Sequence, residues 1–241
     1  MIKKKIDNYL SRVVNRSLEK LHFQNGCSTL NLSRYNYKNV KKIIETDLKI
    51  YSQNGEDGII DYLLFSLNIE KPKFIEIGVG DYSESNTRFF FERTSGDGLI
   101  IDIIDDFEKK VKENVKIWKG NLKILQQNID ANNILDTLKN NNFSQKIDLL
   151  SLDIDGIDYW ILKELPKNFC KILVAEYNPY FGDKFKITVP NIKNFNRSSY
   201  HYSNLCFGAS LPALIDLLKT KGMDFVGTNL FKNNAFFVNN D

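Results

Sequence analysis

Short apolar runs alternate with amphipathic stretches along most of this chain. The apolar runs predict strands at 73–77, 98–102, 122–127, 147–153 and 171–177. Apolar residues at helical spacing predict a helix over 59–67 before the first strand, and further helices that begin near residue 85 and cover 105–114, 131–141 and 158–164. Strands that are separated by helices in this way form a mostly parallel sheet.

The last part of the chain departs from that alternation. A long polar segment over 178–207 follows the fifth strand, and a helix over 210–221 ends at Gly222, a residue typical of helix C-termini. Residues 223–227 and 235–238 then predict a β-hairpin. The predicted fold class is a doubly wound, Rossmann-like α/β fold, with a seven-stranded, mostly parallel sheet that ends in an antiparallel hairpin.

The first 50 residues predict a helical extension, and residues 51–241 predict a single domain. A basic amphipathic helix is expected over about 1–23, followed by a connection over 24–39 that is rich in Asn, Ser, Gly and Tyr. Three roles are expected for this helix as alternatives: packing on the domain, pairing in a homodimer, or contact with an anionic membrane surface. Because no Trp or Phe precedes Phe23, packing or pairing is favoured.

Composition narrows the class of protein further. The 241 residues include 33 basic and 30 acidic side chains, a net charge of +3. This balance argues against bulk electrostatic binding of nucleic acid. Three widely spaced cysteines form neither a metal-binding pair nor a disulfide framework, which indicates a reduced, cytoplasmic setting. No transmembrane segment of about 18 apolar residues and no signal peptide is expected.

The candidate chemistry begins at the turn that follows the first strand, Phe74-Ile75-Glu76-Ile77-Gly78-Val79-Gly80-Asp81. Doubly wound proteins build a nucleotide pocket at this place, and the glycines let the backbone approach a ligand closely. A dinucleotide fingerprint would have a third glycine where Ser83 stands, and Glu76 would bring a carboxylate close to a pyrophosphate. A carboxylate suits a cationic ligand such as S-adenosylmethionine, which carries a sulfonium and an amino group.

The second strand ends in Asp102, which stands 22 residues after Gly80. In nucleotide-binding α/β folds a carboxylate about 20 residues beyond the glycine turn binds the ribose. Asp102 is therefore predicted to accept hydrogen bonds from ribose hydroxyls. The alternative is that it only caps the helix that follows.

Three carboxylates, Asp153, Asp155 and Asp158, follow the fourth strand in one short loop. Carboxylates this close repel one another unless they share a proton, a cation or helix N–H groups. One prediction is a hard cation such as Mg²⁺ that holds a substrate hydroxyl and lowers its pKa. The other is a general base, Asp153 or Asp155, that takes a proton during methyl transfer. Asp158 is expected to cap the next helix, and a structural role for Asp155 would be to fix the loop.

Two further residues join the candidate site. Glu176 ends the fifth strand, beside the tip of the fourth, so it adds an oxygen ligand or is a structural carboxylate. The candidate metal ligands are thus Asp153, Asp155 and Glu176. His201 lies in the polar segment expected to cover the pocket and is a candidate base or ligand, with a structural role as the alternative. The candidate catalytic residues are Asp153, Asp155 and His201.

Several motifs together resemble one group of bacterial class I S-adenosylmethionine-dependent methyltransferases. The motifs are Tyr51–Gly58, Glu76–Asp81 with Glu84–Thr87, Leu152–Gly156, Glu176–Pro179, Gly208–Leu211 and Asn234–Val238. The group accompanies capsule and surface-polysaccharide biosynthesis, including capsules decorated with O-methyl phosphoramidate, and is similar in outline to the FkbM-type and macrocin-type O-methyltransferases. The resemblance covers about residues 50–241.

This resemblance implies an O-methyltransferase whose acceptor is a sugar or a phosphorylated or phosphoramidate precursor. The cofactor contacts expected for this chain are Gln53, Glu76, Gly78, Gly80, Asn86, Asp102, Asp130 and Asp153. Asp130 is also expected to cap the helix after it. Tyr82 stands where such turns often carry a third glycine, and it is expected to narrow the space beside the methionine end. The alternatives are a nicotinamide-dependent sugar oxidoreductase and a non-catalytic partner subunit with the same fold.

Overall fold

The computed structural model describes residues 2–240, with side chains described at Val14 and over 17–240. The chain divides into two compact units, Met1–Val40 and Lys41–Asp241. This division lies earlier in the chain than the boundary expected at residue 50.

The smaller unit consists of one long helix, α1 (Ile2–Arg34), and a short turn, η1 (Tyr37–Asn39). The prediction of a helix that ends near residue 23, with a connection over 24–39, is therefore wrong. The helix continues through Asn25 and Gly26, because a glycine inside a helix costs only about 1 kcal/mol and does not by itself end it. Val14, Leu18 and Leu21 form an apolar stripe along α1, and each is more than half exposed. Homodimer pairing through this helix stays a prediction.

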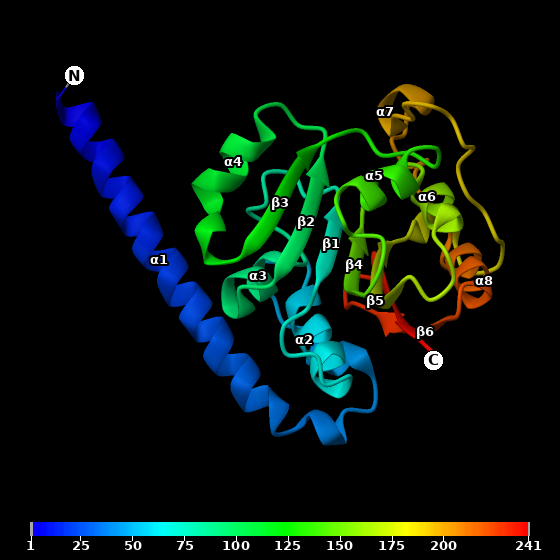
Figure 1. Cartoon of the computed structure of the whole chain (residues 1–241), viewed down its shortest axis with the longest axis horizontal. Coiled ribbons are helices and arrows are strands. Elements are labelled where there is room, and N and C mark those ends of the chain that lie inside the picture. Colours follow the sequence, from blue (N-terminus) through cyan, green and yellow to red (C-terminus); the bar gives the residue numbers. More distant parts are fainter. Residues whose placement is uncertain (1, 241) are drawn as a thin grey trace. The chain divides into compact units, whose positions relative to one another are not determined.

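The larger unit is built on a seven-stranded sheet (Figure 1). In chain order the strands are β1 (Phe74–Ile77), β2 (Asp97–Asp102), β3 (Asn121–Gln126), β4 (Ile147–Leu152), β5 (Cys170–Glu176), β6 (Met223–Thr228) and β7 (Asn234–Asn239). Their order across the sheet is β3-β2-β1-β4-β5-β7-β6. The first five strands run parallel, whereas β7 is antiparallel to both β5 and β6. The predicted fold class is confirmed.

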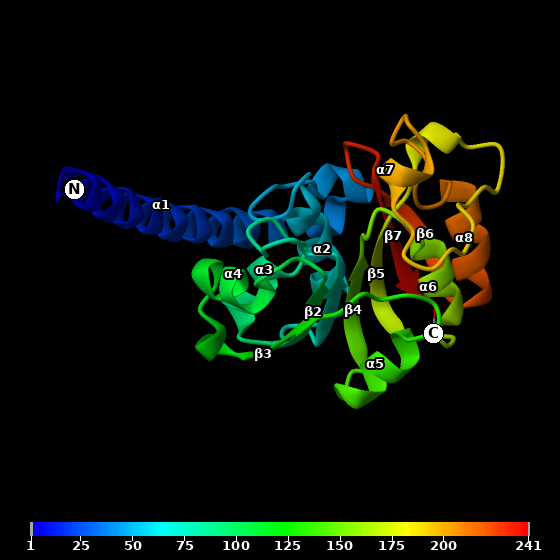
Figure 2. The same cartoon turned by 90° about the horizontal axis from the view of Figure 1, so that it is seen from above.

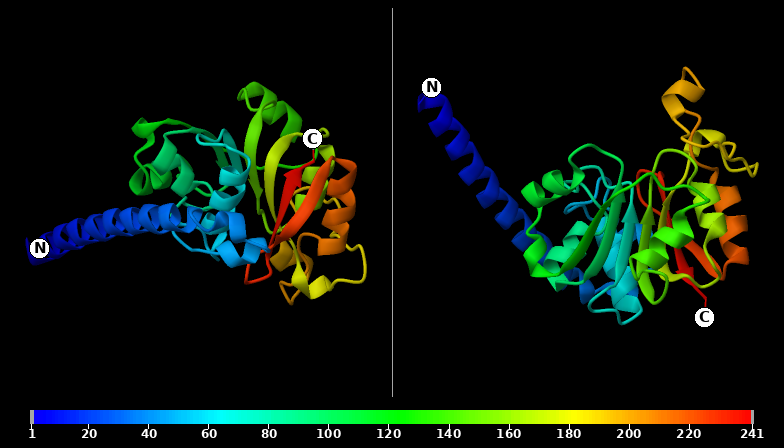
Figure 3. Two further views of the ribbon diagram at one scale, coloured as in Figure 1. Left: turned by 90° about the horizontal axis from the view of Figure 1, so that it is seen from below. Right: turned by 45° about the horizontal axis from the view of Figure 1, so that its top comes forward.

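Helices cover both faces of this sheet (Figures 2 and 3). The helices are α2 (Glu56–Ser66), α3 (Arg88–Thr94), α4 (Phe107–Asn114), α5 (Ile134–Asn140), α6 (Asp158–Glu164), α7 (Arg197–Tyr200) and α8 (Leu211–Thr220), with short 3₁₀ turns η2 (Ile43–Thr46), η3 (Ile117–Lys119) and η4 (Pro179–Phe181). Over residues 2–240, no helix has the length and apolar character needed to cross a membrane.

The core explains why the strands are nearly continuous apolar runs. Alternate strand residues face opposite sides of a sheet. On one side, Ile75, Leu99 and Leu150 belong to a buried apolar cluster with residues of α5, α6 and α8. On the other side, Phe74 packs edge-on against Phe91 of α3, with 6.4 Å between ring centroids. A sheet that is buried on both faces needs apolar residues on both.

The carboxyl ends of β1, β2, β4 and β5 meet at one edge of the sheet, where the parallel register continues past the strand ends. The Gly78 N–H donates to the Ile101 carbonyl at 2.9 Å, and the Asp153 N–H donates to the Ile77 carbonyl at 3.0 Å. These bonds hold the glycine turn between the ends of β2 and β4, and loops that are far apart in the sequence converge there.

Candidate functional site

Two cavities lie at this edge of the sheet. The first has a volume of about 340 Å³ and is formed by the ends of β1, β2 and β4 with the loop after β3. The second has a volume of about 280 Å³ and lies between the glycine turn and the loop over 81–86. Both are lined by Gly78, Gly80 and Asp153, so they meet at the turn. Their combined size suits a small-molecule ligand, for which sites span about 300–1,000 Å³.

The structure brings all eight predicted cofactor contacts to these two cavities. Asp102 and Asp130 line the first cavity, and Gln53, Glu76 and Asn86 line the second. Gly78, Gly80 and Asp153 belong to both, and the candidate catalytic residue Asp155 lines the first. The remaining two candidates, Glu176 and His201, line neither cavity.

The two glycines of the turn serve different purposes. Gly78 has a φ of +84°, and a Cβ on it would lie 1.6 Å from the Asp153 carbonyl oxygen. Only glycine therefore permits β4 to approach the turn this closely. Gly80 has a φ of +57° with nothing within 4 Å of an added Cβ, so it faces open space beside the cavities.

Asp102 connects the glycine turn to the end of β2. Its Oδ2 accepts from the Gly80 N–H at 2.7 Å, and its Oδ1 accepts from the N–H groups of Ile103 at 2.6 Å and Ile104 at 3.1 Å. A carboxylate has about four acceptor positions, so one stays available to a hydroxyl in the cavity. The capping alternative fails, because α4 begins five residues later, with Asp106 at its N-cap.

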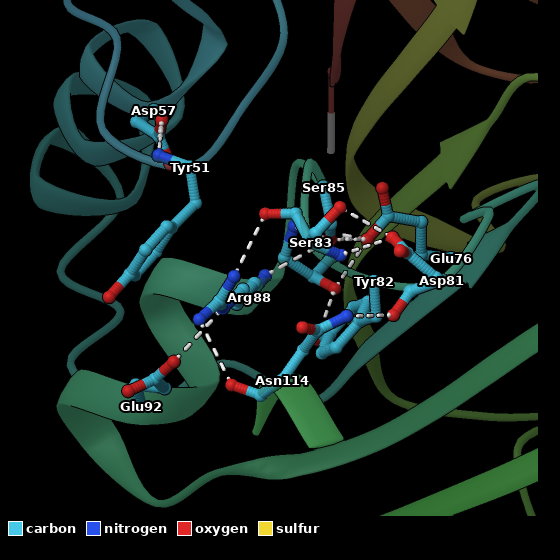
Figure 4. Close-up of polar contacts among 11 residues, drawn as sticks. Tyr51, Asp57, Glu76, Asp81, Tyr82, Ser83, Ser85, Arg88, Glu92 and Asn114 are labelled. Atoms are coloured by element: carbon cyan, nitrogen blue, oxygen red, sulfur yellow. Dashed lines mark hydrogen bonds and ion pairs between the residues drawn. The ribbon is translucent and has the colours of Figure 1, made fainter. Parts of the chain in front are cut away.

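Glu76 is the buried carboxylate of β1, and it organises the loop that precedes α3 (Figure 4). It accepts hydrogen bonds from Ser85 Oγ at 2.5 Å, Asn86 N–H at 2.9 Å, Thr87 N–H at 3.0 Å and Thr87 Oγ1 at 2.5 Å. Burial raises the pKa of Glu76, and these hydrogen bonds oppose the rise. Because residues 85–87 turn around this carboxylate, α3 begins at Arg88 and not near residue 85 as predicted.

The prediction that Tyr82 narrows the pocket is wrong. Its side chain is fully buried and lines neither cavity, and its hydroxyl lies 2.9 Å from Thr87 Oγ1. Its backbone adopts a φ of +65°, the left-handed conformation that a third glycine would otherwise supply. The turn thus has a glycine-like backbone at this position, with an aromatic side chain that anchors it in the core.

Arg88 is a buried cation that sequence reasoning missed (Figure 4). It donates to the carbonyl oxygens of Ser83 at 2.9 Å and Asn114 at 3.0 Å, and it pairs with Glu92 at 3.0 Å. Its guanidinium lies 4.0 Å from the centroid of the Tyr51 ring. Arg88 therefore ties the loop of the second cavity to α4 and to the segment before α2. The sequence feature that could have indicated a buried arginine is its position directly before three phenylalanines.

The loop that carries Gln53 is fixed by a second buried carboxylate, Asp57. One oxygen of Asp57 accepts from the N–H groups of Ile50, Tyr51 and Ser52 at 2.7–2.8 Å. Its other oxygen is buried and has no hydrogen-bond partner among the described residues. Burial raises the pKa of Asp57 from 3.8 to about 6, because it outweighs these hydrogen bonds.

This raised pKa predicts a pH-dependent stability. A carboxyl whose pKa is higher in the folded state binds its proton more tightly there, so its contribution is complete below pH 3.8 and is lost as the pH rises through about 6. As the pH rises over that range, the ionisation of Asp57 should lower the free energy of unfolding by about 3 kcal/mol. Asp57→Asn should remove this part of the pH dependence in urea unfolding between pH 4 and pH 7. The control is Asp136→Asn at an exposed site; equal slopes for wild type and Asp57→Asn would contradict the assignment.

Asp153, Asp155 and Glu176 come together beside the junction of the cavities. Each offers a carboxylate oxygen within 4.8 Å of the others. Burial, together with the charges of Asp158 and Asp155, raises the pKa of Asp153, and burial beside Asp153 raises the pKa of Glu176. Glu176 Oε2 is buried and has no partner among the described residues. The geometry therefore favours a shared proton or a shared cation.

The other two loop carboxylates take roles that differ from those predicted. Asp158 accepts from the N–H groups of Ile154 at 2.9 Å and Gly156 at 3.0 Å, so it fixes the loop. It does not cap α6 as predicted, because the N-cap of that helix is Ile157 and Asp158 is its first residue. Asp155, the residue expected to fix the loop, forms an ion pair with Arg197 instead. Asp130 accepts from the N–H groups two and three residues ahead, in the turn before α5, and the N-cap of α5 itself is Asn133.

His201 is not part of the site that the cavities define. Its Nδ1 lies 2.7 Å from Ser203 Oγ and accepts from the Ser203 N–H at 3.2 Å. Its ring lies beside that of Tyr202, with 4.4 Å between centroids. His201 lies in the polar segment, and its ring contacts Ser203 in a local turn. This arrangement corresponds to the structural role that was the alternative to a base or ligand.

No protein-family model matches this chain, and no curated protein sequence matches it. Solved structures with a similar fold include an O-methyltransferase family protein from Burkholderia thailandensis, with 10% identity, a TM-score of 0.46, and coverage of 87% of this chain and 69% of that one. Human N-acetylserotonin methyltransferase in complex with SAM has 12% identity, a TM-score of 0.44, and coverage of 92% and 57%. The fibrillarin pre-rRNA processing protein of Methanococcus jannaschii has 14% identity, a TM-score of 0.42, and coverage of 70% and 66%.

These likenesses concern the arrangement of strands and helices. This chain spans about three fifths to two thirds of the length of those proteins. A likeness at this level of identity shows the fold alone.

Proposed function

We propose that this protein is an S-adenosylmethionine-dependent O-methyltransferase. The observation that carries the proposal is the charge of the two cavities. Seven carboxyl groups line them: Glu76, Asp81, Glu84, Asp102, Asp130, Asp153 and Asp155. Among the described residues, no Lys, Arg or His side chain lines either cavity. Such a field attracts a cation and repels a pyrophosphate, which disfavours a nicotinamide dinucleotide.

The shape of the site supports the same cofactor. We assign the nucleoside to the first cavity, where Asp102 keeps an acceptor position for a ribose hydroxyl. The amino acid end would lie in the second cavity, with Gln53 and Asn86 near its polar groups. Gly80 leaves open space where the cavities meet, so one elongated cationic ligand can occupy both. Bound there, S-adenosylmethionine would supply an electrophilic methyl group on a positively charged sulfur.

We assign the acceptor proton to Asp153. It lies at the junction of the cavities, and its raised pKa brings its ionisation closer to neutral pH, as a general base requires. The chain's part is then to hold an acceptor hydroxyl beside Asp153, to exclude water and to accept the proton. Orientation of this kind provides much of the rate enhancement in two-substrate reactions.

The three clustered carboxylates also fit a divalent cation. Their oxygens are close enough to share one ion, and Glu176 Oε2 has no other described partner. Mg²⁺ prefers such oxygen ligands, and it would lower the pKa of the acceptor hydroxyl. Asp153 would then be a ligand and not the base. A requirement of methyl transfer for Mg²⁺ distinguishes these two arrangements.

The acceptor that we propose is a hydroxyl of a sugar, or of a phosphorylated or phosphoramidate precursor, in capsule or surface-polysaccharide biosynthesis. This part rests on the motif resemblance over residues 50–241. We propose further that residues 51–241 form the methyltransferase domain and that the protein acts in the cytoplasm on a small-molecule or glycan-precursor substrate.

Calorimetric titration with S-adenosylhomocysteine, with NAD as the comparison ligand, tests the proposal. We expect micromolar binding of S-adenosylhomocysteine and none of NAD. Asp102→Ala should weaken that binding about tenfold or more, because it removes the ribose acceptor and the Gly80 contact. Asp105→Ala, at an exposed site nearby, is the matched control. Binding of NAD alone would support the oxidoreductase alternative, and binding of neither ligand would support a non-catalytic subunit.

A further inference from the structure

The polar segment over 178–207, named here the covering segment, reaches the mouth of the first cavity. Asn194 and Phe195 line that cavity, and the Asn194 side chain accepts a hydrogen bond of 3.0 Å from Asn128 Nδ2. At the base of the segment, the buried Asn178 donates from Nδ2 to the carbonyl oxygens of Leu205 at 2.7 Å and Phe207 at 2.9 Å. Both ends of the segment are thus fastened, and its middle forms the rim of the cavity.

Arg197 presents a fixed cation at this rim. Its Nη1 pairs with Asp155, which lines the first cavity, and its guanidinium lies 5.2 Å from the centroid of the Phe207 ring. The side chain nevertheless stays 38% exposed. A guanidinium has five N–H donors, and among the described residues Asp155 is the hydrogen-bond acceptor that it contacts. Most of its donors therefore remain available to a ligand, in an orientation that is already set.

Two aromatic residues flank this cation in the sequence, Phe195 before it and Tyr200 at the end of α7. Phe195, at the cavity wall, contacts Tyr200 with 5.1 Å between ring centroids and 44° between ring planes. Tyr200 is 47% exposed, so part of its ring stays uncovered. Aromatic faces beside a guanidinium and a carboxylate can contact the C–H face of a sugar ring while the polar groups bind its substituents.

We propose that Arg197, Tyr200 and Phe195 form the acceptor subsite, and that it takes a sugar carrying an anionic group, a phosphate or a carboxylate. This inference rests on the proposed methyltransferase function. The seven carboxylates of the cavities would repel an anion, so the anionic group has to lie on the outer side, where Arg197 faces solvent. Asp155 then lies between that group and the interior and can accept from a sugar hydroxyl.

The test is an NMR titration of the protein saturated with S-adenosylhomocysteine. The probes are glucose 1-phosphate, glucuronate and methyl glucoside, and the signal is the Arg197 Nε–H resonance, identified by its absence from Arg197→Lys. We expect the two anionic probes to shift it and to bind at least tenfold more tightly than methyl glucoside. The stronger of the two identifies phosphate or carboxylate as the preferred group.

Variants separate the parts of the subsite. Arg197→Lys should weaken the anionic probes about tenfold, because a lysine cannot provide two parallel donors. Tyr200→Ala should weaken all three probes alike. Lys219→Ala, an exposed cation on α8, should change nothing. Equal affinity for charged and neutral probes, or unchanged affinity in Arg197→Lys, would overturn the proposal. S-adenosylhomocysteine binding is measured first; if it fails, the proposed function fails, and the same titrations without it still test the subsite.

Discussion

Asp153→Asn is expected to lower methyl transfer by about 10²–10⁴-fold, the usual contribution of a general base. Asparagine keeps the size of the side chain but can neither accept a proton nor offer an anionic ligand. The measurement is transfer of a labelled methyl group to the best acceptor in a panel of sugars and sugar phosphates. A variant that keeps more than a tenth of the wild-type rate would exclude Asp153 from the chemistry.

Two controls make this result specific. Binding of S-adenosylhomocysteine should change much less than the rate, since the loss concerns the acceptor proton. In the wild type, kcat/KM should rise with pH as the Asp153 carboxyl, whose pKa is raised by burial and by neighbouring carboxylates, loses its proton. The same rise should be absent from the residual activity of Asp153→Asn. A rise that persists in the variant would assign the titration to another group.

Gly78→Ala should destabilise the protein by about 2–5 kcal/mol. Overpacking a close contact costs about 1–3 kcal/mol, and a left-handed backbone costs a residue with a Cβ about 1–2 kcal/mol more. Both apply here, because the added methyl would meet the backbone of Asp153 and not a flexible side chain. Urea unfolding gives the free-energy change, and a fall in S-adenosylhomocysteine affinity should accompany it as the turn shifts.

Gly80→Ala is the matched control for that substitution. It carries a similar positive φ, yet the added methyl would meet nothing within 4 Å. We expect a loss of only about 1–2 kcal/mol, the backbone part alone. Because the methyl would project toward the cavities, ligand affinity should still fall. Equal loss of stability at both positions would show that the approach of β4 does not determine the cost at Gly78.

The sheet could be predicted from the sequence because its signal is local. Strands buried on both faces are apolar throughout, and the turns between them carry glycines and polar residues. The positions of the eight predicted cofactor contacts follow from the same alternation of strands and helices. Parallel strands connected by helices have their carboxyl ends at one edge of the sheet, so the residues that follow them lie close together. The extent of α1 was missed because Asn25 and Gly26 resemble a break although the helix tolerates them.

Details that depend on contacts between distant segments could not be predicted. The backbone of Tyr82 adopts the left-handed conformation typical of glycine, and its ring is buried in the core beside Thr87. Arg88 donates hydrogen bonds to the carbonyl oxygens of Ser83 and Asn114. Every residue has a backbone carbonyl, so the pattern of residue types does not predict these contacts. The ion pair of Asp155 depends on where the covering segment places Arg197.

The position of β7 has a consequence for biosynthesis. This strand follows β6 in the chain, yet it lies between β5 and β6 in the sheet. Until residues 234–239 have joined the sheet, β5 has an open edge and β6 lacks its neighbour in the sheet. Such an edge can pair with other chains. The folding chain is therefore most exposed to misassembly before β7 joins the sheet, and a chaperone that covers the open edge of β5 would protect it at that stage.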